Sequence, residues 1–242
     1  MPSKPLLSEG SVQKEESRLL DAYARRESLP KDLYSFLNYG NLASFQEREA
    51  HIISALRRYT VKMPLHAARL LEVGCGSGFW IREFIKWGVS PENAFGVDLL
   101  ADAIAEAHRL SPPGVSFRRG NVINIEFPDE SFDLVVQSMV FTSVLDPQLR
   151  ICLAKEMLRV ARRGCLIIWY DFHVNNPKNC DVQGIKKKEI LFLFPNCHVT
   201  LRRLTLMPPL ARYLGRYSLR LVRFLSMFKP LCTHYLGIID KP

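Results

Sequence analysis

Two spacings of apolar residues divide the chain. Between positions 15 and 60 the apolar residues recur at helical intervals, most clearly from Leu42 to Tyr59. From Ala68 onward, short apolar runs of strand length alternate with segments of helical spacing. Strands separated by helices of this length predict a parallel sheet with helices on both faces.

The elements of the alternating region follow from their apolar runs and breakers. The pattern predicts five strands at 69–73, 94–98, 115–119, 132–137 and 165–170, and helices at 79–87, 101–110 and 147–162. Arg159, Arg162 and Arg163 would lie near the negative end of the last helix, which Gly164 would close.

The alternation breaks down after Asp171. A polar loop leads to a helix at 185–194, a strand at 198–206, a basic and apolar helical segment at 208–229, and a last strand at 234–239. We therefore predict a doubly wound, Rossmann-like α/β fold with a mainly parallel seven-stranded sheet, an antiparallel edge strand, an N-terminal helical arm and a C-terminal helical insertion.

Charge is concentrated at the C-terminal end. The 242-residue chain has a net charge of +9, and residues 178–242 alone carry 12 Lys and Arg against 3 Asp and Glu. The basic quarter indicates either a local anionic partner or a solvated helix face, and both readings stay open. The chain has no apolar run of about 20 residues, its first 17 residues lack the apolar core of a secretory signal, and its six cysteines are scattered. A reduced, cytoplasmic protein is the simplest interpretation.

A glycine-rich turn follows the first strand and opens the first helix after it. It contains Gly74, Cys75, Gly76 and Gly78, and Glu72 precedes it by two residues. Glycine allows a tight turn and lets a ligand approach the main chain. The turn stands at the carboxyl end of a strand, where open α/β sheets bind ligands.

Asp98 ends the second strand, 20 residues after Gly78. Both strand ends meet at one crevice, where a carboxylate can accept both hydroxyl groups of an adenosine ribose. A dinucleotide fingerprint, G-x-G-x-x-G, would need glycine at position 79, which holds Phe79. The pattern therefore disfavours a nicotinamide dinucleotide.

Four linked segments resemble class I S-adenosylmethionine-dependent methyltransferases of the small-molecule type: 72–78, 96–98, 120–122 and 127–136. The resemblance covers roughly residues 70–170 and implies S-adenosyl-L-methionine as cofactor. It implies that the Gly74–Gly78 turn cradles the methionine part, that Glu72 shapes this turn, and that Asp98, with Leu99 beside it, holds the ribose. It also implies adenine contacts from Asn121 and Val122, and a place for Gln137 near the methionine amine or the acceptor.

The resemblance also suggests a division of the chain and a pathway class. Residues 1–65 would form an N-terminal arm and helical lid, and 66–242 the methyltransferase domain, with a helical acceptor cap at about 207–231. Segments 140–145, 166–171, 175–178 and 233–237 are similar to bacterial methyltransferases of polysaccharide and natural-product pathways. This similarity supports the reaction type more than a particular substrate.

Candidate acceptor-site residues follow the fifth strand. We expect Asp171 or His173 to act as base or to orient the acceptor, while backbone hydrogen bonding by both is the alternative. The aromatic stretch 33–39 is a candidate lid. Arg212, Arg216, Arg220 and Arg223 recur at helical spacing, as in a cap over an apolar or phosphate-bearing acceptor, a peripheral membrane contact or a docked amphipathic helix.

The reaction we expect is methyl transfer to a small molecule, foremost O-methylation of a sugar or secondary metabolite. Alternatives are C-methylation of an apolar or prenyl-type acceptor, RNA methylation, and cofactor binding without turnover. Nucleic acid is disfavoured because positions 137–140 read Gln-Ser-Met-Val where base-amine methyltransferases carry an Asn/Asp-Pro-Pro-aromatic tetrad. We expect no metal, since the carboxylates and histidines show no ligand-like grouping. The oligomeric state stays open.

Overall fold

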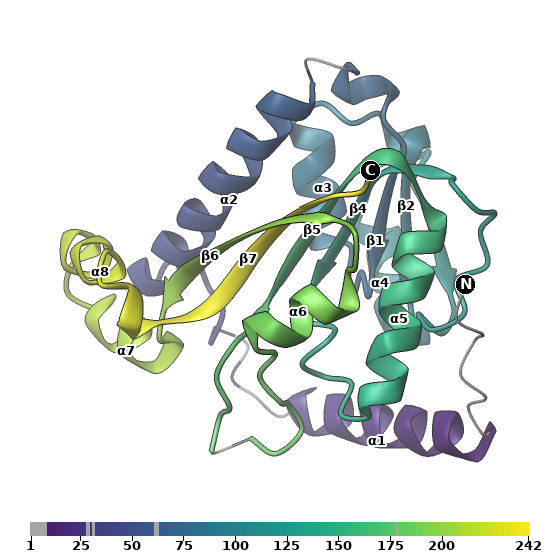
Figure 1. Ribbon diagram of the computed structural model, residues 1–242. Helices are drawn as coiled ribbons and strands as arrows, with labels where there is room; N and C mark the ends of the chain where they lie inside the picture. Colours follow the sequence, from purple (N-terminus) through teal and green to yellow (C-terminus); the bar gives the residue numbers. More distant parts are fainter. Residues whose placement is uncertain (1–8, 28–29, 31, 61–62, 178) are drawn as a thin grey trace.

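Seven strands form a single sheet in the computed structural model of the chain, which describes residues 9–27, 30, 32–60, 63–177 and 179–242 (Figure 1). The strands lie in the order β3-β2-β1-β4-β5-β7-β6. Their bounds are β1 Leu70–Val73, β2 Ala94–Asp98, β3 Ser116–Arg119, β4 Phe132–Ser138, β5 Ala161–Phe172, β6 His198–Leu206 and β7 Cys232–Asp240.

Eight α-helices surround the sheet in the described ranges. They are α1 Glu9–Glu27, α2 Tyr39–Tyr59, α3 Phe79–Lys86, α4 Ala101–Leu110, α5 Pro147–Val160, α6 Lys187–Leu193, α7 Pro208–Leu214 and α8 Leu219–Ser226. Short 3-10 turns stand at Leu65–Ala67, Pro91–Asn93 and Lys229–Leu231. None of the helices in the described part of the chain has the length and apolar character that crossing a bilayer requires.

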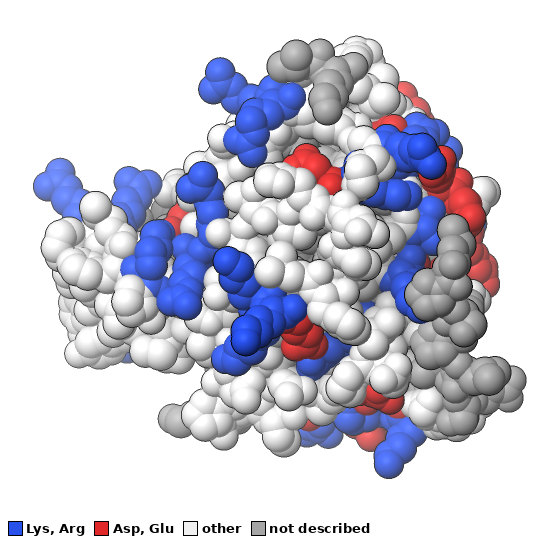
Figure 2. Space-filling model, viewed as in Figure 1, with Lys and Arg blue, Asp and Glu red and all other residues white. Residues whose placement is uncertain are grey.

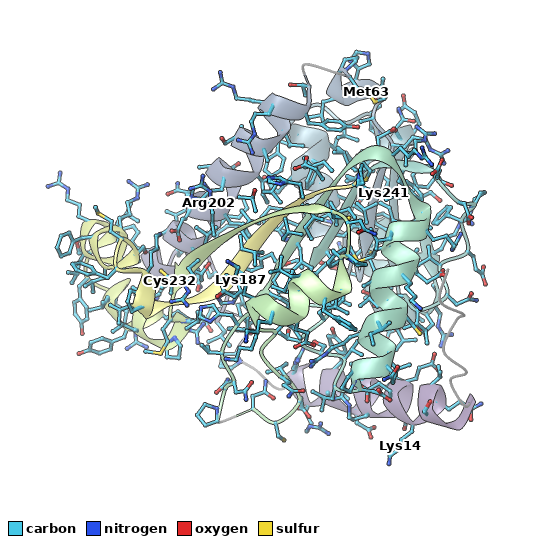
Figure 3. All side chains as sticks on the ribbon, in the orientation of Figure 1. Lys14, Met63, Lys187, Arg202, Cys232 and Lys241 are labelled. Atoms are coloured by element: carbon cyan, nitrogen blue, oxygen red, sulfur yellow. The ribbon has the colours of Figure 1, made fainter. Side chains whose placement is uncertain are left out.

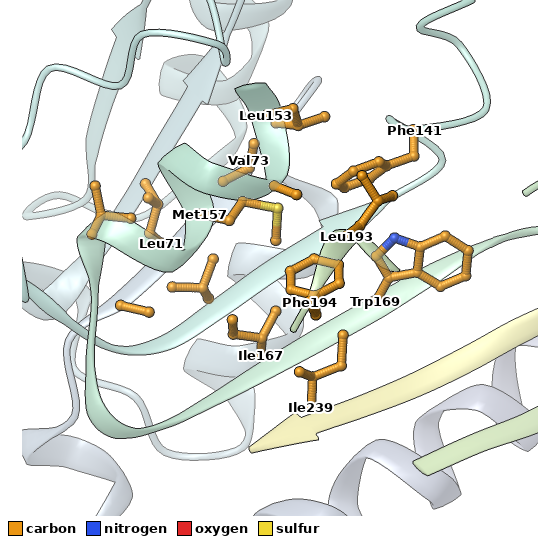
Figure 4. Close-up of a cluster of buried hydrophobic side chains, with 14 of the residues drawn as sticks. Leu71, Val73, Phe141, Leu153, Met157, Ile167, Trp169, Leu193, Phe194 and Ile239 are labelled. Atoms are coloured by element: carbon orange, nitrogen blue, oxygen red, sulfur yellow. The ribbon is translucent and has the colours of Figure 1, made fainter. Parts of the chain in front are cut away.

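Successive residues of the central strands point to opposite faces of the sheet, so each face has its own core. Leu70, Leu134 and Ile168 pack under α2, α3 and α4. The neighbouring residues on the other face, such as Leu71 and Ile167, pack under α5 and α6 (Figure 4). The strands are apolar along their whole length because both faces are covered.

The predicted fold class is confirmed, with one difference in the late strands. β1 to β5 pair in parallel, and β7 is antiparallel to both of its neighbours, β5 and β6. The antiparallel strand therefore lies one position inside the edge, while the edge strand β6 runs in the same direction as β5. The helical segment between β6 and β7 turns the chain back, so that β7 lies between β5 and β6, the two strands that precede it in the sequence.

The junction between α5 and β5 differs from the prediction. The helix expected at 147–162 ends at Val160, and Arg162 and Arg163 belong to β5, where Arg162 pairs with the buried Asp133 at 2.8 Å. Gly164 lies within this strand at φ 75° rather than closing a helix.

The helical segment expected at 208–229 is two helices, α7 and α8. They separate after Gly215, and the Ser218 side chain caps the second by accepting from Leu221 N at 3.2 Å. The four arginines therefore do not form the stripe of a single helix. Part of the N-terminal arm, from residue 9 onward, is the long helix α1.

Helices α2 and α7 approach each other most closely at Gly40. A Cβ atom added there would lie 2.1 Å from the carbonyl oxygen of Ala211. The neighbouring Asn38 caps α2 by accepting from Gly40 N at 2.8 Å, and its amide donates to the Arg212 carbonyl at 3.0 Å. Bare backbone at Gly40 thus lets α7 dock on the beginning of α2.

We predict that Gly40→Ala destabilises the protein, because the added methyl group overlaps backbone rather than a flexible side chain. The expected loss is about 1–3 kcal/mol of unfolding free energy, with a fall in Tm of about 2–4 °C for each kcal/mol. Thermal denaturation measures it. Gly10→Ala is the matched control, since Gly10 is an exposed helical glycine with nothing within 4 Å of its added Cβ. Equal Tm values for the two variants would contradict the close contact.

Candidate functional site

The glycine-rich turn after β1 is held by the end of β2. Gly74 N and Cys75 N both donate to the carbonyl oxygen of Val97, at 2.8 and 3.0 Å. Gly74, Gly76 and Gly78 have φ values of 70°, 50° and 74°, the left-handed region that favours glycine. A Cβ atom on Gly74 would lie 2.4 Å from the Val140 side chain. The turn therefore requires glycine for its backbone conformation and, at Gly74, for its packing.

Asp98 links this turn to the turn after β2. One carboxylate oxygen accepts from Gly76 N at 2.8 Å and the other from Leu100 N at 3.0 Å. Burial raises the pKa of Asp98, and the backbone hydrogen bonds lower it in part. Each oxygen retains a lone pair for a further donor such as a ribose hydroxyl group.

A cavity lies at the carboxyl ends of β1, β2 and β4, with about 610 Å³ of space, part of it open to solvent. Half of the predicted cofactor residues line it: Gly74, Asp98, Leu99, Asn121 and Val122. The bare backbone at Gly74 and the carboxylate of Asp98 fit the methionine and ribose parts of S-adenosylmethionine.

The other five predicted residues do not line the cavity but contact the turns and strands that form it. Gly76 holds Asp98, Gly78 begins α3, and Cys75 packs against Gly96. Glu72 is buried under the turn and accepts from Ile81 N at 3.2 Å, and burial raises its pKa well above the ordinary value. Gln137 is fully buried and joins Val140 N to the Tyr170 carbonyl. A cofactor contact by Gln137 remains a prediction, because its amide is occupied by backbone here.

Helix α1, which belongs to the N-terminal arm and helical lid expected at 1–65, forms the outer wall of the cavity. Its lining residues share one helical face and are Val12, Glu15, Glu16, Leu19 and Tyr23. Lys14 projects from the opposite side, away from the sheet (Figure 3). The helical spacing of Val12, Leu19 and Tyr23 was the available signal.

Two glutamates fasten α1 to the sheet. Glu15 accepts from Leu145 N at 2.7 Å and pairs with Arg18, whose guanidinium also donates to the Ser143 carbonyl. Glu16 accepts from the side-chain amide of Asn121. The Asn121 carbonyl oxygen accepts from Ile123 N at 3.0 Å, so both ends of the predicted adenine-binding amide are engaged in this structure.

Asp171 and His173, the expected base or orienting groups, do not line the cavity. Asp171 is fully buried and accepts from Phe141 N at 3.0 Å and from the Thr142 hydroxyl. His173 Nε2 lies 2.9 Å from the Cys232 carbonyl oxygen, and its ring packs on Tyr235. Burial lowers the pKa of His173. The structure gives both side chains backbone partners, and their catalytic roles stay predictions.

A polar cluster that sequence reasoning missed lies between α2 and the ends of β4 and β5. The Arg48 guanidinium stands over the rings of Trp80 and Tyr170, 4.2 and 4.1 Å from their centroids, and donates to the Ser138 hydroxyl at 3.4 Å. Its buried Nε finds no acceptor among the described residues. Burial lowers the pKa of Arg48, and nearby Tyr170 and Glu72 raise it.

Two further groups complete this cluster. The Tyr170 hydroxyl pairs with the Thr205 hydroxyl at 2.7 Å, and its ring stacks on His234. Burial lowers the pKa of His234 well below its ordinary value, so this imidazole is a weak base. Burial also raises the pKa of Tyr170, which keeps the phenol neutral. The cluster thus offers one half-buried cation and no strong base.

No group of three or more metal-binding side chains occurs within the ranges that the structure describes. The lid expected at 33–39 lies beside α7 rather than over the cavity wall, with Leu37 94% exposed. Phe36 in this stretch packs against Phe45 and Phe79.

Comparison with known proteins agrees with this geometry. The methyltransferase domain family matches residues 70–164. A phthiotriol/phenolphthiotriol dimycocerosates methyltransferase of Mycobacterium tuberculosis is 35% identical over 137 residues, 55% of this chain and 48% of that protein. A fatty-acid O-methyltransferase of Mycolicibacterium smegmatis is 29% identical over 170 residues, 66% of this chain and 60% of that protein.

Solved structures share the fold. An S-adenosylmethionine-dependent methyltransferase of Mesorhizobium loti has a TM-score of 0.55 at 17% identity, over 76% of this chain and 96% of that one. One from Archaeoglobus fulgidus has a TM-score of 0.53 at 17% identity, over 80% and 94%.

Residues 70–164 form a methyltransferase domain, and the chain has the fold of class I S-adenosylmethionine-dependent methyltransferases. The chain spans about half the length of the curated relatives it matches.

We predict that Asp98→Asn weakens binding of S-adenosylhomocysteine by about tenfold or more, because a charge-assisted acceptor is replaced by an amide. Isothermal titration calorimetry measures the Kd, and the Tm of the variant reports whether its turn is intact. Asp102→Asn, an exposed carboxylate four residues further on, is the control and should bind as the wild type does. A folded Asp98→Asn with unchanged affinity would refute the ribose contact.

Asp171 predicts a pH dependence of stability. Burial raises its pKa to about 7, although hydrogen bonds from Thr142 and Phe141 act against the shift. In the unfolded chain an Asp titrates near pH ~3.9, so protonation favours the folded state. The Asp171 contribution is fully present below that pH and is lost as the pH rises through about 7.

We therefore expect Asp171→Asn to flatten the decline of unfolding free energy between pH 5 and pH 7, by at most about 1.4 kcal/mol for each pH unit. The asparagine carbonyl can still accept from Phe141 N, so the variant should fold. Urea denaturation across this range measures the slope, with Asp102→Asn as the control. Parallel curves for the wild type and Asp171→Asn would show that Asp171 does not titrate there.

Proposed function

We propose that the protein transfers the methyl group of S-adenosylmethionine to an oxygen atom of a small, largely apolar acceptor, and that this oxygen belongs to a carboxylate. The observation that carries the proposal is the position of Arg48. Its guanidinium lies at the carboxyl end of β4 beside Ser138, two residues before Val140, which lines the cofactor cavity.

The charge of Arg48 supports an anionic acceptor. Arg48 is a half-buried residue, and its buried, unpaired Nε costs folding free energy unless something compensates it. The planar group matches a carboxylate in shape and hydrogen bonding. The contacts of Arg48 to Ser138 and Tyr170 lie toward β4 and β5, on the side away from Asp98.

The weak bases of the cluster support the same choice. A hydroxyl or amine acceptor needs a group that takes its proton. Tyr170 stays neutral, His234 is a poor proton acceptor, and Asp171 and His173 hydrogen-bond inside the fold. A carboxylate is already ionised at neutral pH and needs no base.

The cofactor would supply a methyl group on a sulfonium. The residues of this chain would bind the two reactants, orient them and exclude water. Asp98 and the Gly74 backbone would hold the donor, and Arg48 would orient the acceptor oxygen. Helix α1 with the Trp80 and Tyr170 rings would keep solvent out. The relatives named for fatty-acid O-methylation and for phthiotriol dimycocerosates methylation favour an apolar acceptor over a sugar.

An acceptor panel tests the proposal. The wild-type protein is incubated with S-adenosylmethionine and medium- and long-chain fatty acids, the matching fatty alcohols, prenyl alcohols, hydroxylated sugars or RNA, and the products are analysed by mass spectrometry. We expect methyl esters of the fatty acids. Methylation of the alcohols, sugars, prenyl carbons or RNA instead would overturn the carboxylate assignment, and donor binding without any product would favour a cofactor-binding role.

Arg48→Met and Arg48→Lys refine the same assay. We expect Arg48→Met to raise the acceptor KM about tenfold or more while the Kd for S-adenosylhomocysteine stays unchanged, because a buried charged hydrogen bond is lost. Arg48→Lys should recover part of the loss. A weakened donor affinity with an unchanged acceptor KM would instead place the Arg48 contact on the methionine carboxylate.

A further inference from the structure

We infer that residues 207–231, which include α7 and α8, and residues 34–39 form a docking surface for an anionic lipid bilayer, here called the apolar-basic face. Large exposed apolar side chains are concentrated there rather than scattered. Twelve of the sixteen in the described chain lie in this face: Tyr34, Phe36, Leu37, Tyr39, Met207, Tyr213, Tyr217, Leu221, Phe224, Met227, Phe228 and Leu231. Contiguous apolar exposure on this scale marks an interaction site.

The α8 helix has more apolar surface than its packing uses. Val222 is fully buried, and Leu219 and Leu225 pack beside it against α2 and α7. Leu221, Phe224 and Phe228 recur at helical spacing but are 40%, 55% and 50% exposed. A helix that is only docked on a protein core carries polar residues on its outer side. The exposed side of α8 carries Leu221 and Phe224 beside Arg220 and Arg223, and therefore fits an environment that is apolar and bordered by anionic groups.

The two segments of this face are joined. Tyr39 N donates to the Gly215 carbonyl at 3.2 Å, and the Asn38 amide donates to the Arg212 carbonyl at 3.0 Å. Leu37, the most exposed of the twelve, directly precedes this junction. Figure 1 shows α7 and α8 standing to one side of the molecule, at the end of α2 where residues 34–39 lead in.

Charge identifies the partner as anionic. Residues 207–231 contain five basic residues and no acidic one. Arg223 bonds to Gln46 and Lys229 pairs with Glu47, whereas no described side chain engages the guanidinium groups of Arg212, Arg216 and Arg220. In Figure 2 the lobe that α7 and α8 form is largely uncharged, with isolated basic side chains projecting from it.

A bilayer fits this combination better than RNA or a protein. Tyr and Phe side chains favour the headgroup level of a membrane, and each nearby Lys or Arg adds about 1 kcal/mol of attraction to an anionic surface. Exposed aliphatic side chains such as Leu37, Leu221 and Met227 would have no role against a phosphate backbone. The inference does not depend on which acceptor is methylated.

Vesicle co-sedimentation of the full chain tests the inference. The wild type is mixed with vesicles of phosphatidylcholine alone or phosphatidylcholine with phosphatidylglycerol. We expect binding to the mixed vesicles that weakens as salt is added, since surface charges are screened. Failure to bind the mixed vesicles at low salt would overturn the proposal.

Paired variants assign the binding to this face. Phe224→Ser with Phe228→Ser should lower the vesicle partition coefficient about tenfold or more, because two exposed aromatic side chains that would insert into the bilayer are lost. Arg216→Glu with Arg220→Glu should abolish the preference for phosphatidylglycerol. The controls are Leu191→Ser with Phe192→Ser, an equally exposed apolar pair on α6, and Arg57→Glu with Arg58→Glu on α2. Both control pairs should bind vesicles as the wild type does.

Three measurements separate the competing explanations. Calorimetry with S-adenosylhomocysteine should give the wild-type Kd for all variants, which shows that the fold and the donor site are intact. Light scattering should give the same mass for the wild type and the face variants; a change in mass without any vesicle binding would make this face a contact between copies and overturn the proposal. If RNA displaces the wild type from vesicles and the face variants fail to bind that RNA, the face is an RNA-binding surface and the bilayer proposal is overturned.

Discussion

The carboxylate of Asp98 joins the end of β2 to the glycine turn after β1, and the candidate site is built around this link. Its two oxygens accept from Gly76 N and Leu100 N, so one side chain sets the course of two turns. The Val97 carbonyl next to it holds Gly74 and Cys75. The turn thus takes its shape from the neighbouring strand, and the floor of the cavity follows from strand pairing.

Strand pairing also explains which parts of the fold can be predicted from the sequence. β2, α4 and β6 match their predicted bounds because each is a uniform run between clear breakers. The start of β5 was missed because Arg162 and Arg163 suggest a helix end, whereas a distant partner, Asp133, holds Arg162 in a strand. An ion pair across the sheet leaves no trace in local spacing.

The residues of the candidate site likewise divide into those that the sequence predicts and those that depend on distant contacts. Gly74, Asp98, Leu99, Asn121 and Val122 were predictable because each follows a strand end whose place in the sheet is determined by the order of the strands. The contacts of α1 and of Arg48 with the sheet were not, since they join residues far apart in sequence. Glu16 meets Asn121 across 105 residues, and Arg48 meets Ser138 across 90. Neither contact alters the pattern around either partner.

The charges around the two halves of the site oppose each other. The cavity wall carries Glu15, Glu16 and Asp98, and the cluster at the ends of β4 and β5 carries Arg48. A cationic donor is favoured beside the carboxylates and an anionic acceptor beside the guanidinium. Under the proposed reaction both charges disappear together, because a sulfonium becomes a thioether and a carboxylate becomes an ester. Each product would then lose the charge attraction that its precursor had to its half of the site, so the same charges that assemble the reactants would favour release of the products.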